Sequence, residues 1–508
     1  MAIVLRTRDG RLDAEDTAHL AILEAALQQP EPKLLLHLHG GLVNEANGMA
    51  TASRLGGATP DGFGLGQEWQ QVFVVWRTGA LETVATNWID LFENDRLYKA
   101  LLRKLIEFAA RKIILPVEAG RGAGASVRLT RAEIDARLAR RPKGDPFADI
   151  GDLFPPDAAG QGRASLSPTQ SEYDLAQEFQ AELEQDNQFA DAVVQLTSAI
   201  VPVAGRGGLV GTPDDERAAG EMLARLSAEI RGELGERVNG PGGRGVVSVT
   251  IAVLRHAASI ILRIVRRMRA QRDHGFYATI VEELARELYG DLVGAAVWGM
   301  MKKDAADHFK DGHLGRQLLD VIPAGCRLVV TAHSAGSIWA AEMIKVIAAL
   351  RLELRLDLVL LGPAARMDLF AEAIRNGGDA VARRRIYALS DSLERADAVL
   401  GHDKGYIYPS SLLYLVSGLF EEVGATPFPD APLVGMQRFL SGNTPWLIEK
   451  DQVSAAKTVM DFFSPAADAI VYSKTEADAA VGMRTQADMH GGFDDEHETL
   501  ASIASFFS

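Results

Sequence analysis

The sequence predicts an α/β protein with a mostly parallel sheet flanked by helices and a large helical insertion. Short apolar runs of strand length alternate with helical patterns near both ends of the chain. This alternation is typical of a parallel sheet that helices cover on both faces. Between the two ends, residues 81–309 show mostly helical spacing, interrupted by loops rich in Gly, Pro and Asp. We therefore expect a sheet core formed by residues 1–80 and 310–508, with residues 81–309 as a separate inserted domain.

The first piece of the core begins with a helix and continues into two strands. From Ala14 to Gln29 the apolar residues have helical spacing, and the prolines at 30 and 32 end the pattern. The apolar run Lys33–Leu38 predicts a buried strand that leads directly into a His-Gly-Gly sequence, and Gln71–Trp76 predicts a second strand. The chain then leaves the sheet for the helical insertion.

The longest apolar stretch of the insertion is Val246–Ala270. Basic residues gather at its end, and Arg255 and His256 interrupt it, so we do not expect a transmembrane span. We expect a core helix of the insertion. The alternatives are an interfacial helix that contacts a membrane or lipid surface and a helix that forms one wall of a substrate pocket.

The second piece of the core returns to the alternating pattern. A short helix at Gly315–Val321 precedes a strand that begins at Arg327. Further strands are expected at Leu356–Leu361, Arg385–Leu389 and Asp468–Tyr472, with helices such as Pro409–Val423 between them. The strands are almost continuously apolar, which indicates burial on both faces.

Composition and charge limit the partners and the compartment. The chain of 508 residues has 53 basic and 68 acidic side chains and a net charge of −15, so its overall field opposes nucleic acids and anionic membranes. Its single cysteine, Cys326, excludes an intramolecular disulfide, and its place before an apolar strand predicts a buried thiol. The N-terminus has no long apolar run. Together these features predict a cytoplasmic protein, and they leave the oligomeric state open.

The stretch RLVVTAHSAGSIWA, from Arg327 to Ala340, carries the main chemical signal. A short buried strand ends at a serine, Ser334, and a helical pattern follows at once. A tight corner of this kind exposes the hydroxyl but leaves space only for small residues two positions away, here Ala332 and Gly336. The backbone N–H of Ala335 would lie at the helix N-terminus, where negative charge is favoured.

The stretch HLHGGLVNE, from His37 to Glu45, follows the first predicted strand. Two histidines at i and i+2 suggest a metal site, but no neighbouring cysteine or acidic pair completes a ligand set. We therefore expect no metal site there.

These two stretches resemble the nucleophile elbow (G-x-S-x-G) and the His-Gly oxyanion loop of lipases and esterases of the α/β-hydrolase superfamily. Ala332 replaces the first glycine of the elbow, a mild departure because the demand is for a small residue. The resemblance covers about residues 1–79 and 315–508. It implies an α/β-hydrolase fold with Ser334 as the nucleophile. It also implies an oxyanion hole formed by the N–H groups of Ala335 and Gly41, with Leu42 as the second choice for Gly41.

The same resemblance places the acid after a late strand and the histidine near the C-terminus. Asp391 follows the strand RIYALS and is the expected acid, with Glu394 as the alternative. Asp397 is also near. The simpler interpretation of Glu394 and Asp397 is that they lie on a solvated helix face. His490, in the sequence DMHGGFDDEHETL, is the expected base because glycines follow it. The rival, His497, lies among acids at the start of the last helix and is expected to be exposed.

The resemblance implies hydrolysis of a small-molecule acyl ester through an acyl-enzyme formed by a Ser-His-Asp triad. This mechanism needs neither a metal nor an organic cofactor. It would place the helical insertion over the carboxyl ends of the strands as a cap. Two alternatives stay open. The same fold could act on an amide, thioester or polyester bond, or it could be a non-catalytic scaffold that binds a ligand or partner.

Overall fold

The computed structural model describes residues 2–41, 43–57, 61–76, 81–112, 129–151, 171–201, 212–239, 245–270, 272–290, 292, 294–422, 428–440, 449–464 and 469–507. Its framework is one eight-stranded sheet with the order β2-β1-β4-β3-β5-β6-β7-β8. All neighbouring strands are parallel except β1 and β2, which pair antiparallel. The strands are β1 (Ala2–Arg8), β2 (Arg11–Leu12), β3 (Lys33–Leu38), β4 (Trp69–Trp76), β5 (Arg327–His333), β6 (Leu356–Leu361), β7 (Val381–Leu389) and β8 (Ile470–Ser473).

The predicted assembly of the sheet from two distant pieces of sequence is confirmed. Strand β3, from the first piece, lies beside β5, from the second, with Leu38 opposite Ala332. The pairing brings the His-Gly-Gly sequence after β3 next to Ser334 after β5, because the carboxyl ends of parallel strands meet at one edge of the sheet. The sequence analysis did not predict β1 and β2, which form one edge, and β7 begins earlier than expected, at Val381.

Two apolar cores cover the two faces of the sheet. Alternate residues of a strand point to opposite faces, so Leu34 and Leu36 belong to the larger core and Leu35 to the smaller one. The larger core packs against α1 (Thr17–Leu27), α14 (Leu314–Val321), α15 (Gly336–Ala349), α16 (Met367–Gly377) and α20 (Lys450–Phe463). The smaller core packs against α2 (Glu45–Leu55) and α21 (His497–Ala504).

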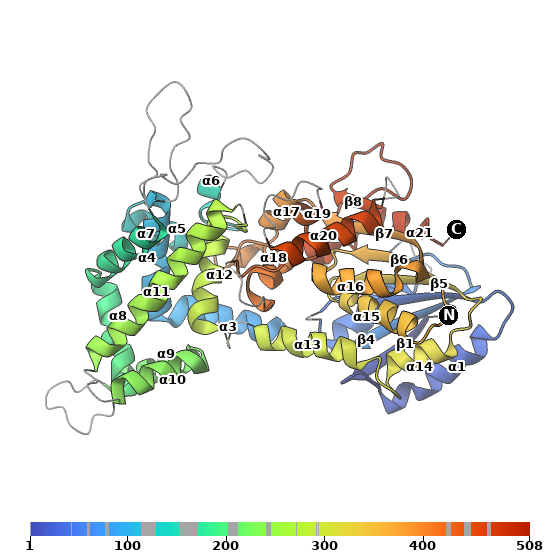
Figure 1. Ribbon diagram of the computed structural model, residues 1–508, viewed down its shortest axis with the longest axis horizontal. Helices are drawn as coiled ribbons and strands as arrows, with labels where there is room; N and C mark the ends of the chain where they lie inside the picture. Colours follow the sequence, from blue (N-terminus) through green and yellow to red (C-terminus); the bar gives the residue numbers. More distant parts are fainter. Residues whose placement is uncertain are drawn as a thin grey trace.

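The described part of residues 81–309 contains helices and no strand, as expected. These helices are α3 (Leu81–Asn94), α4 (Arg96–Lys112), α5 (Arg131–Ala139), α6 (Ala148–Gly151), α7 (Glu172–Glu184), α8 (Asn187–Ile200), α9 (Pro213–Arg225), α10 (Ala228–Asn239), α11 (Val246–Arg269), α12 (Phe276–Tyr289) and α13 (Ala295–Asp307). Most of them form a block beside the sheet, and α3 and α13 lead toward it (Figure 1). We call residues 81–309 the helical block.

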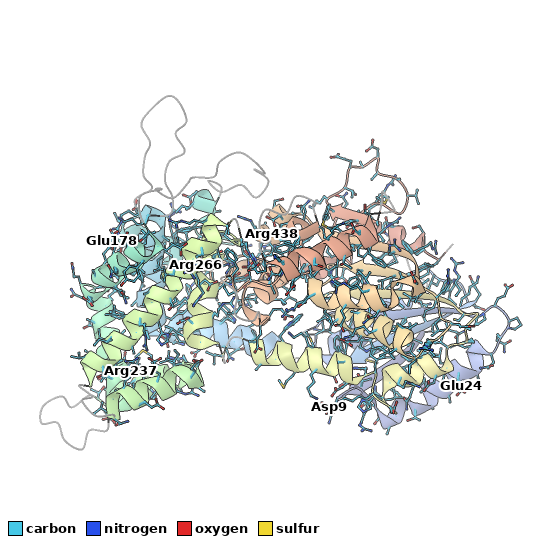
Figure 2. The ribbon with its side chains drawn as sticks, viewed as in Figure 1. Asp9, Glu24, Glu178, Arg237, Arg266 and Arg438 are labelled. Atoms are coloured by element: carbon cyan, nitrogen blue, oxygen red, sulfur yellow. The ribbon has the colours of Figure 1, made fainter. Side chains whose placement is uncertain are left out.

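Short helices join the block to the sheet. They are α17 (Asp391–Ala396), α18 (Leu412–Leu415), the π-helical turn η4 (Val416–Phe420) and α19 (Gln437–Leu440). Both α12 and α13 contact η4. Figure 2 shows Arg438, of α19, at the boundary between the block and the sheet.

Helix α11 corresponds to the apolar stretch Val246–Ala270. By length and composition it is the one helix in the described part of the chain that could cross a membrane, but 44% of its apolar window is buried inside the protein. Two of its arginines, Arg263 and Arg267, form ion pairs with Glu283 of α12 at 2.6 and 2.7 Å. These contacts are those of a core helix of the block, as the sequence analysis expected.

Candidate active site

Ser334 lies at the sharp corner between β5 and α15. Its φ is +49°, in the left-handed region that non-glycine residues rarely adopt and that costs about 1–3 kcal/mol. Neighbouring groups hold this conformation. The N–H of Ser334 donates to the Leu361 carbonyl at 2.8 Å, and its carbonyl accepts from Ala364 N and Ser337 Oγ at 3.0 and 2.6 Å. The hydroxyl is therefore presented by a rigid support.

The expected need for small residues around this corner has a direct steric basis. A Cβ atom on Gly336 would lie 2.5 Å from the carbonyl oxygen of Leu38 and 3.0 Å from its Cβ. Ala332 is fully buried between β3 and β6, opposite Leu38 and Leu360. A larger residue at position 336 would push α15 away from β3 and displace Ser334.

His490 meets Ser334 from the C-terminal part of the chain. It lies in a short 3-10 turn, His490–Gly492, and its Nε2 is 2.9 Å from Ser334 Oγ. Burial, with a smaller contribution from the neighbouring His333, lowers the pKa of His490 to about 3. At neutral pH the ring is uncharged and able to accept a proton. The rival, His497, is exposed at the start of α21.

Asp391, the expected acid, lies elsewhere. Its carboxylate accepts from Arg438 Nε at 2.7 Å and Nη2 at 3.0 Å and from the hydroxyl of Tyr414, and it lies 3.5 Å from Arg395. Despite burial, the arginines lower its pKa to about 2. None of the contacts of Asp391 in the described residues reaches His490. The sequence placed this carboxylate at the end of β7, but tertiary packing turns it toward α19.

The alternative acid, Glu394, is also not bonded to His490 in the described residues. The expectation of a solvated helix face is wrong for both Glu394 and Asp397, which are 1% and 7% exposed. Burial raises the carboxyl pKa of Glu394 well above its usual range.

Asp397 is the carboxylate that contacts His490. Its Oδ2 accepts a hydrogen bond of 2.7 Å from the backbone N–H of His490. The Nδ1 atom of the same histidine has no hydrogen-bond partner among the described residues. Asp397 therefore holds the histidine by its main chain, and the carboxylate whose charge acts on the imidazole is that of Asp494. In the sequence, the only indication for Asp397 was its position six residues after Asp391, the expected acid.

The His-Gly-Gly loop lies against the serine corner. A Cβ atom on Gly40 would be 3.4 Å from Ser334 Cβ, and one on Gly41 would be 2.8 Å from Ala335 Cβ and 2.5 Å from Met301 Sδ. Ala335 precedes the first residue of α15, so its N–H has no carbonyl partner within the helix. Gly41 and Ala335, the two residues expected to donate, thus lie beside each other. Leu42, the second choice, lies outside the described residues.

The two histidines before this loop have structural contacts. His37 Nδ1 is 2.8 Å from Thr331 Oγ1, and His39 Nε2 accepts from the backbone N–H of Trp76 at 3.2 Å. Burial lowers their pKa values to about 3 and 4. No group of three potential ligands that could hold a metal ion occurs in the described part of the chain.

The serine opens into a pocket of about 470 Å³. Apolar walls come from Val43, Val399, Leu412 and Met489, and polar groups come from His333, Asp397, Asp494 and Asp495. All of its described lining residues belong to the sheet core, although α13 of the helical block reaches Gly41 through Met301. The role of the block as a cap therefore stays a prediction.

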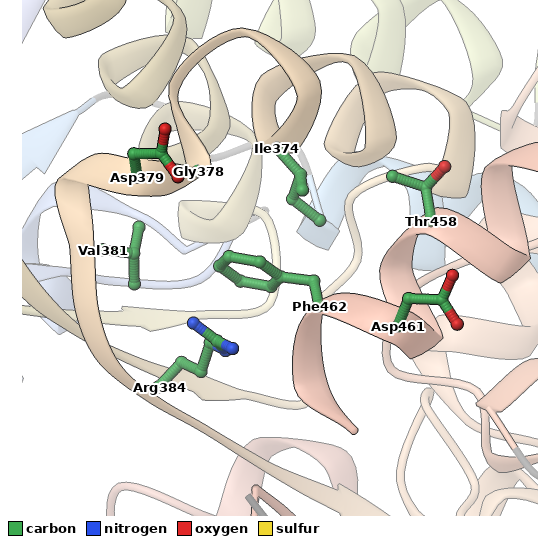
Figure 3. Close-up of a pocket in the computed structure, with 8 residues that line it drawn as sticks. All are labelled: Ile374, Gly378, Asp379, Val381, Arg384, Thr458, Asp461 and Phe462. Atoms are coloured by element: carbon green, nitrogen blue, oxygen red, sulfur yellow. The ribbon is translucent and has the colours of Figure 1, made fainter. Parts of the chain in front are cut away.

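Two other features can be separated from this site. A hollow of about 520 Å³ lies between α16, β7 and α20, and the side chain of Arg384 stacks there on Phe462 (Figure 3). It contains none of the candidate residues.

Cys326 is buried, and burial raises the pKa of its thiol to about 12, which leaves it without a thiolate at neutral pH.

Comparisons with protein-family models, with curated proteins and with solved structures find no match to this chain. Its function must be argued from the geometry of the site.

Proposed function

We propose that the protein is a serine hydrolase of the α/β-hydrolase type that cleaves carboxylic esters. The observation that carries this proposal is the 2.9 Å contact between Ser334 Oγ and His490 Nε2 at a corner where Ser334 is held at a positive φ. A serine hydroxyl becomes a useful nucleophile when a neutral base lies within hydrogen-bond distance. A strained corner held by the surrounding backbone keeps the hydroxyl in one place.

In the proposed reaction, Ser334 Oγ attacks the ester carbonyl while His490 Nε2 takes the serine proton. The N–H groups of Ala335 and Gly41 stabilise the oxyanion of the tetrahedral intermediate. The intermediate expels the alcohol, which receives the proton from His490, and leaves an acyl group on Ser334. Water then attacks this acyl group, with His490 again as the base, and releases the acid and the free serine.

Asp397 takes the part of the acid in this proposal, in place of Asp391. It holds the main chain of His490, and the carboxylate of Asp494 offsets the positive charge that develops on the imidazole. Asp391 is excluded from this part because its charge is already matched by Arg438 and Arg395.

The pocket favours an uncharged ester of small to moderate size. Its volume of about 470 Å³ lies in the range of small-molecule sites. Its described lining includes three aspartates and no lysine or arginine, and the imidazole of His333 already lies 3.5 Å from Asp494, so an anionic acyl group would meet no unpaired cation there. Amides and thioesters would use the same groups, and a panel of matched substrates separates them.

The test is the intact mass of the protein after incubation with a fluorophosphonate. The wild type should gain one adduct, and Ser334→Ala should gain none while keeping its circular dichroism spectrum. Ser198→Ala is the matched control, because it makes the same change at an exposed serine of the helical block and should still gain the adduct. Folded wild type without an adduct would refute the proposal and favour a non-catalytic scaffold.

A further inference from the structure

His333, the residue immediately before Ser334, bonds to the loop that carries His490. Its Nε2 lies 2.9 Å from the carbonyl oxygen of His490, and its Nδ1 lies 3.5 Å from Oδ2 of Asp494, four residues further along that loop. Both residues are buried, at 6% and 7% exposure. The imidazole of His333 therefore contacts the His490 loop at two points and joins it to the corner that carries Ser334.

The hydrogen bonds define the protonation state of this ring. A carbonyl oxygen can only accept, so Nε2 of His333 must carry a proton. If the ring were neutral, the lone pair of Nδ1 would face the carboxylate of Asp494 and repel it. Burial alone would lower the pKa of His333, but the carboxylate of Asp494 outweighs burial and raises it. The pairing with Asp494 therefore favours the imidazolium form of His333.

The other titratable groups around His333 support this charge. From the same loop, Asp495 adds negative charge, and Arg54 of α2 pairs with Asp495 and donates to the backbone carbonyl of Asp494 at 2.6 Å. His37 of β3 and His39, in the loop just after it, are neutral because burial lowers their pKa values. The ring of His490 lies 5.6 Å from that of His333, centroid to centroid, and is also neutral.

We propose that His333 is a positioning residue for the reaction at Ser334: its ion pair with Asp494 holds the His490 loop against the nucleophile, and loss of this pair at alkaline pH disengages the base. This inference rests on the proposed function. It assigns His333 and Asp494 a role in placing His490, with no contact between either residue and the reacting atoms.

The direction of the pH dependence follows from the charges. Asp494 stays ionised over the working range, because His333 and Arg54 hold its pKa at about 2 despite burial. His333 has a raised pKa, so its pairing is complete at lower pH and is lost as the pH rises through that value. The alkaline decline of activity should therefore report the deprotonation of His333.

The experiment makes two kinds of measurement between pH 5 and pH 10. One is the rate at which a fluorophosphonate modifies Ser334, and the other is kcat and KM for p-nitrophenyl acetate. In Asp494→Asn the ion pair is absent at every pH, so kcat and the labelling rate should be lower than in the wild type even at the acidic end of this range. The midpoint of the alkaline decline that remains should fall by about one pH unit, since a paired carboxylate shifts a neighbouring pKa by about 1–3 units. Asp495→Asn is the matched control. Its carboxylate does not bond to His333, so its midpoint should move less.

Two further variants separate positioning from a purely structural role. His333→Gln keeps a donor for the carbonyl of His490 but cannot titrate, so its alkaline decline should disappear. His333→Ala should lose about 100-fold in kcat with a smaller change in KM, because misplacing a catalytic group by about 1 Å costs about that much. His333→Gln should recover part of this loss. If His333→Ala does not fold, the pH profiles of Asp494→Asn and His333→Gln still decide.

An unchanged alkaline midpoint in Asp494→Asn, with wild type that labels at Ser334, would overturn this inference and leave the proposed function standing. Failure of the wild type itself to label would defeat the proposed function and this inference with it.

Discussion

Two buried polar regions of this protein contrast with each other. One surrounds Ser334 at the carboxyl ends of β3 and β5. The other, which we call the boundary cluster, lies where the helical block meets the sheet core. Its members are charged or ionisable, and all are buried except Arg395, whose side chain is 14% exposed. They are Arg267, Arg272, His274, Glu282, Glu283, Asp391, Arg395, Asp430 and Arg438.

In the boundary cluster the charges satisfy one another. Arg267 lies 2.7 Å from both Glu282 and Glu283, and Arg272 lies 2.8 Å from Asp430. No member of the cluster lines the pocket of Ser334. Burying ions is costly unless every charge is paired. Because its members come from both the helical block and the sheet core, the boundary cluster connects these two parts of the molecule.

His274 shows how closely this cluster can imitate a catalytic site. Its Nδ1 lies 2.9 Å from Glu282, as in the acid and base of a triad, but its ring stacks on Tyr414 with centroids 4.3 Å apart. No serine or cysteine bonds to its Nε2 in the described residues. A histidine beside a carboxylate is therefore weak evidence for catalysis, whereas a histidine bonded to a strained serine at a pocket is much stronger evidence.

The largest expected effect tests the serine site. Ser334→Ala and His490→Ala should each lower kcat for p-nitrophenyl acetate by at least about 10³, and the double variant should be no worse than either single one, because the two residues act as a unit. Steady-state kinetics on the three proteins measure this. Additive losses would indicate that the serine and histidine work independently.

The next effect concerns the two aspartates. Asp397→Asn should lower kcat by about 10²–10⁴ with little loss of stability, in the range found when the acid of a triad is neutralised. The same substitution at Asp391 is the matched control. A catalytic loss confined to Asp391→Asn would restore the original assignment of the acid.

A different consequence is expected for Asp391→Asn. Leaving Arg438 buried without its partner should lower the free energy of unfolding by about 3–5 kcal/mol, measured by urea denaturation at pH 7. Asp391 has a lowered pKa of about 2, so its contribution is present above the ordinary aspartate pKa and is lost as the pH falls toward 2. The stability difference between wild type and variant should accordingly shrink in acid. A difference independent of pH would show that the ion pair is not its source.

The smallest effect is expected at the histidine that sequence analysis rejected. His497 is exposed on α21, so His497→Ala should change stability by less than about 0.5 kcal/mol and leave kcat unaltered. Thermal denaturation and ester hydrolysis measure both quantities. A large loss of activity would mean that His490 is not the base.

The sequence by itself determined the elements whose signals are local. The apolar runs of β3 and β6 end at the residues predicted, since burial on both faces requires continuous apolar character. The corner at Ser334 was also predictable, because the small residue at 336 and the strand before it are close neighbours in the chain. Strand β1 was missed, since a strand whose residues alternate between buried and partly exposed lacks the continuous apolar signal.

Only the tertiary structure decided which carboxylate meets His490. Residues 391, 394 and 397 recur every three positions, and all three are buried, so their sequence pattern does not distinguish them. The choice depends on a contact between residues 93 positions apart, Asp397 and His490, and on the competing attraction of Arg438 for Asp391. The hydrogen bond between His333 and the carbonyl of His490 also joins residues far apart in the chain, 157 positions from each other. Such contacts depend on how whole helices and strands pack against one another. They cannot be predicted from the local sequence around either residue.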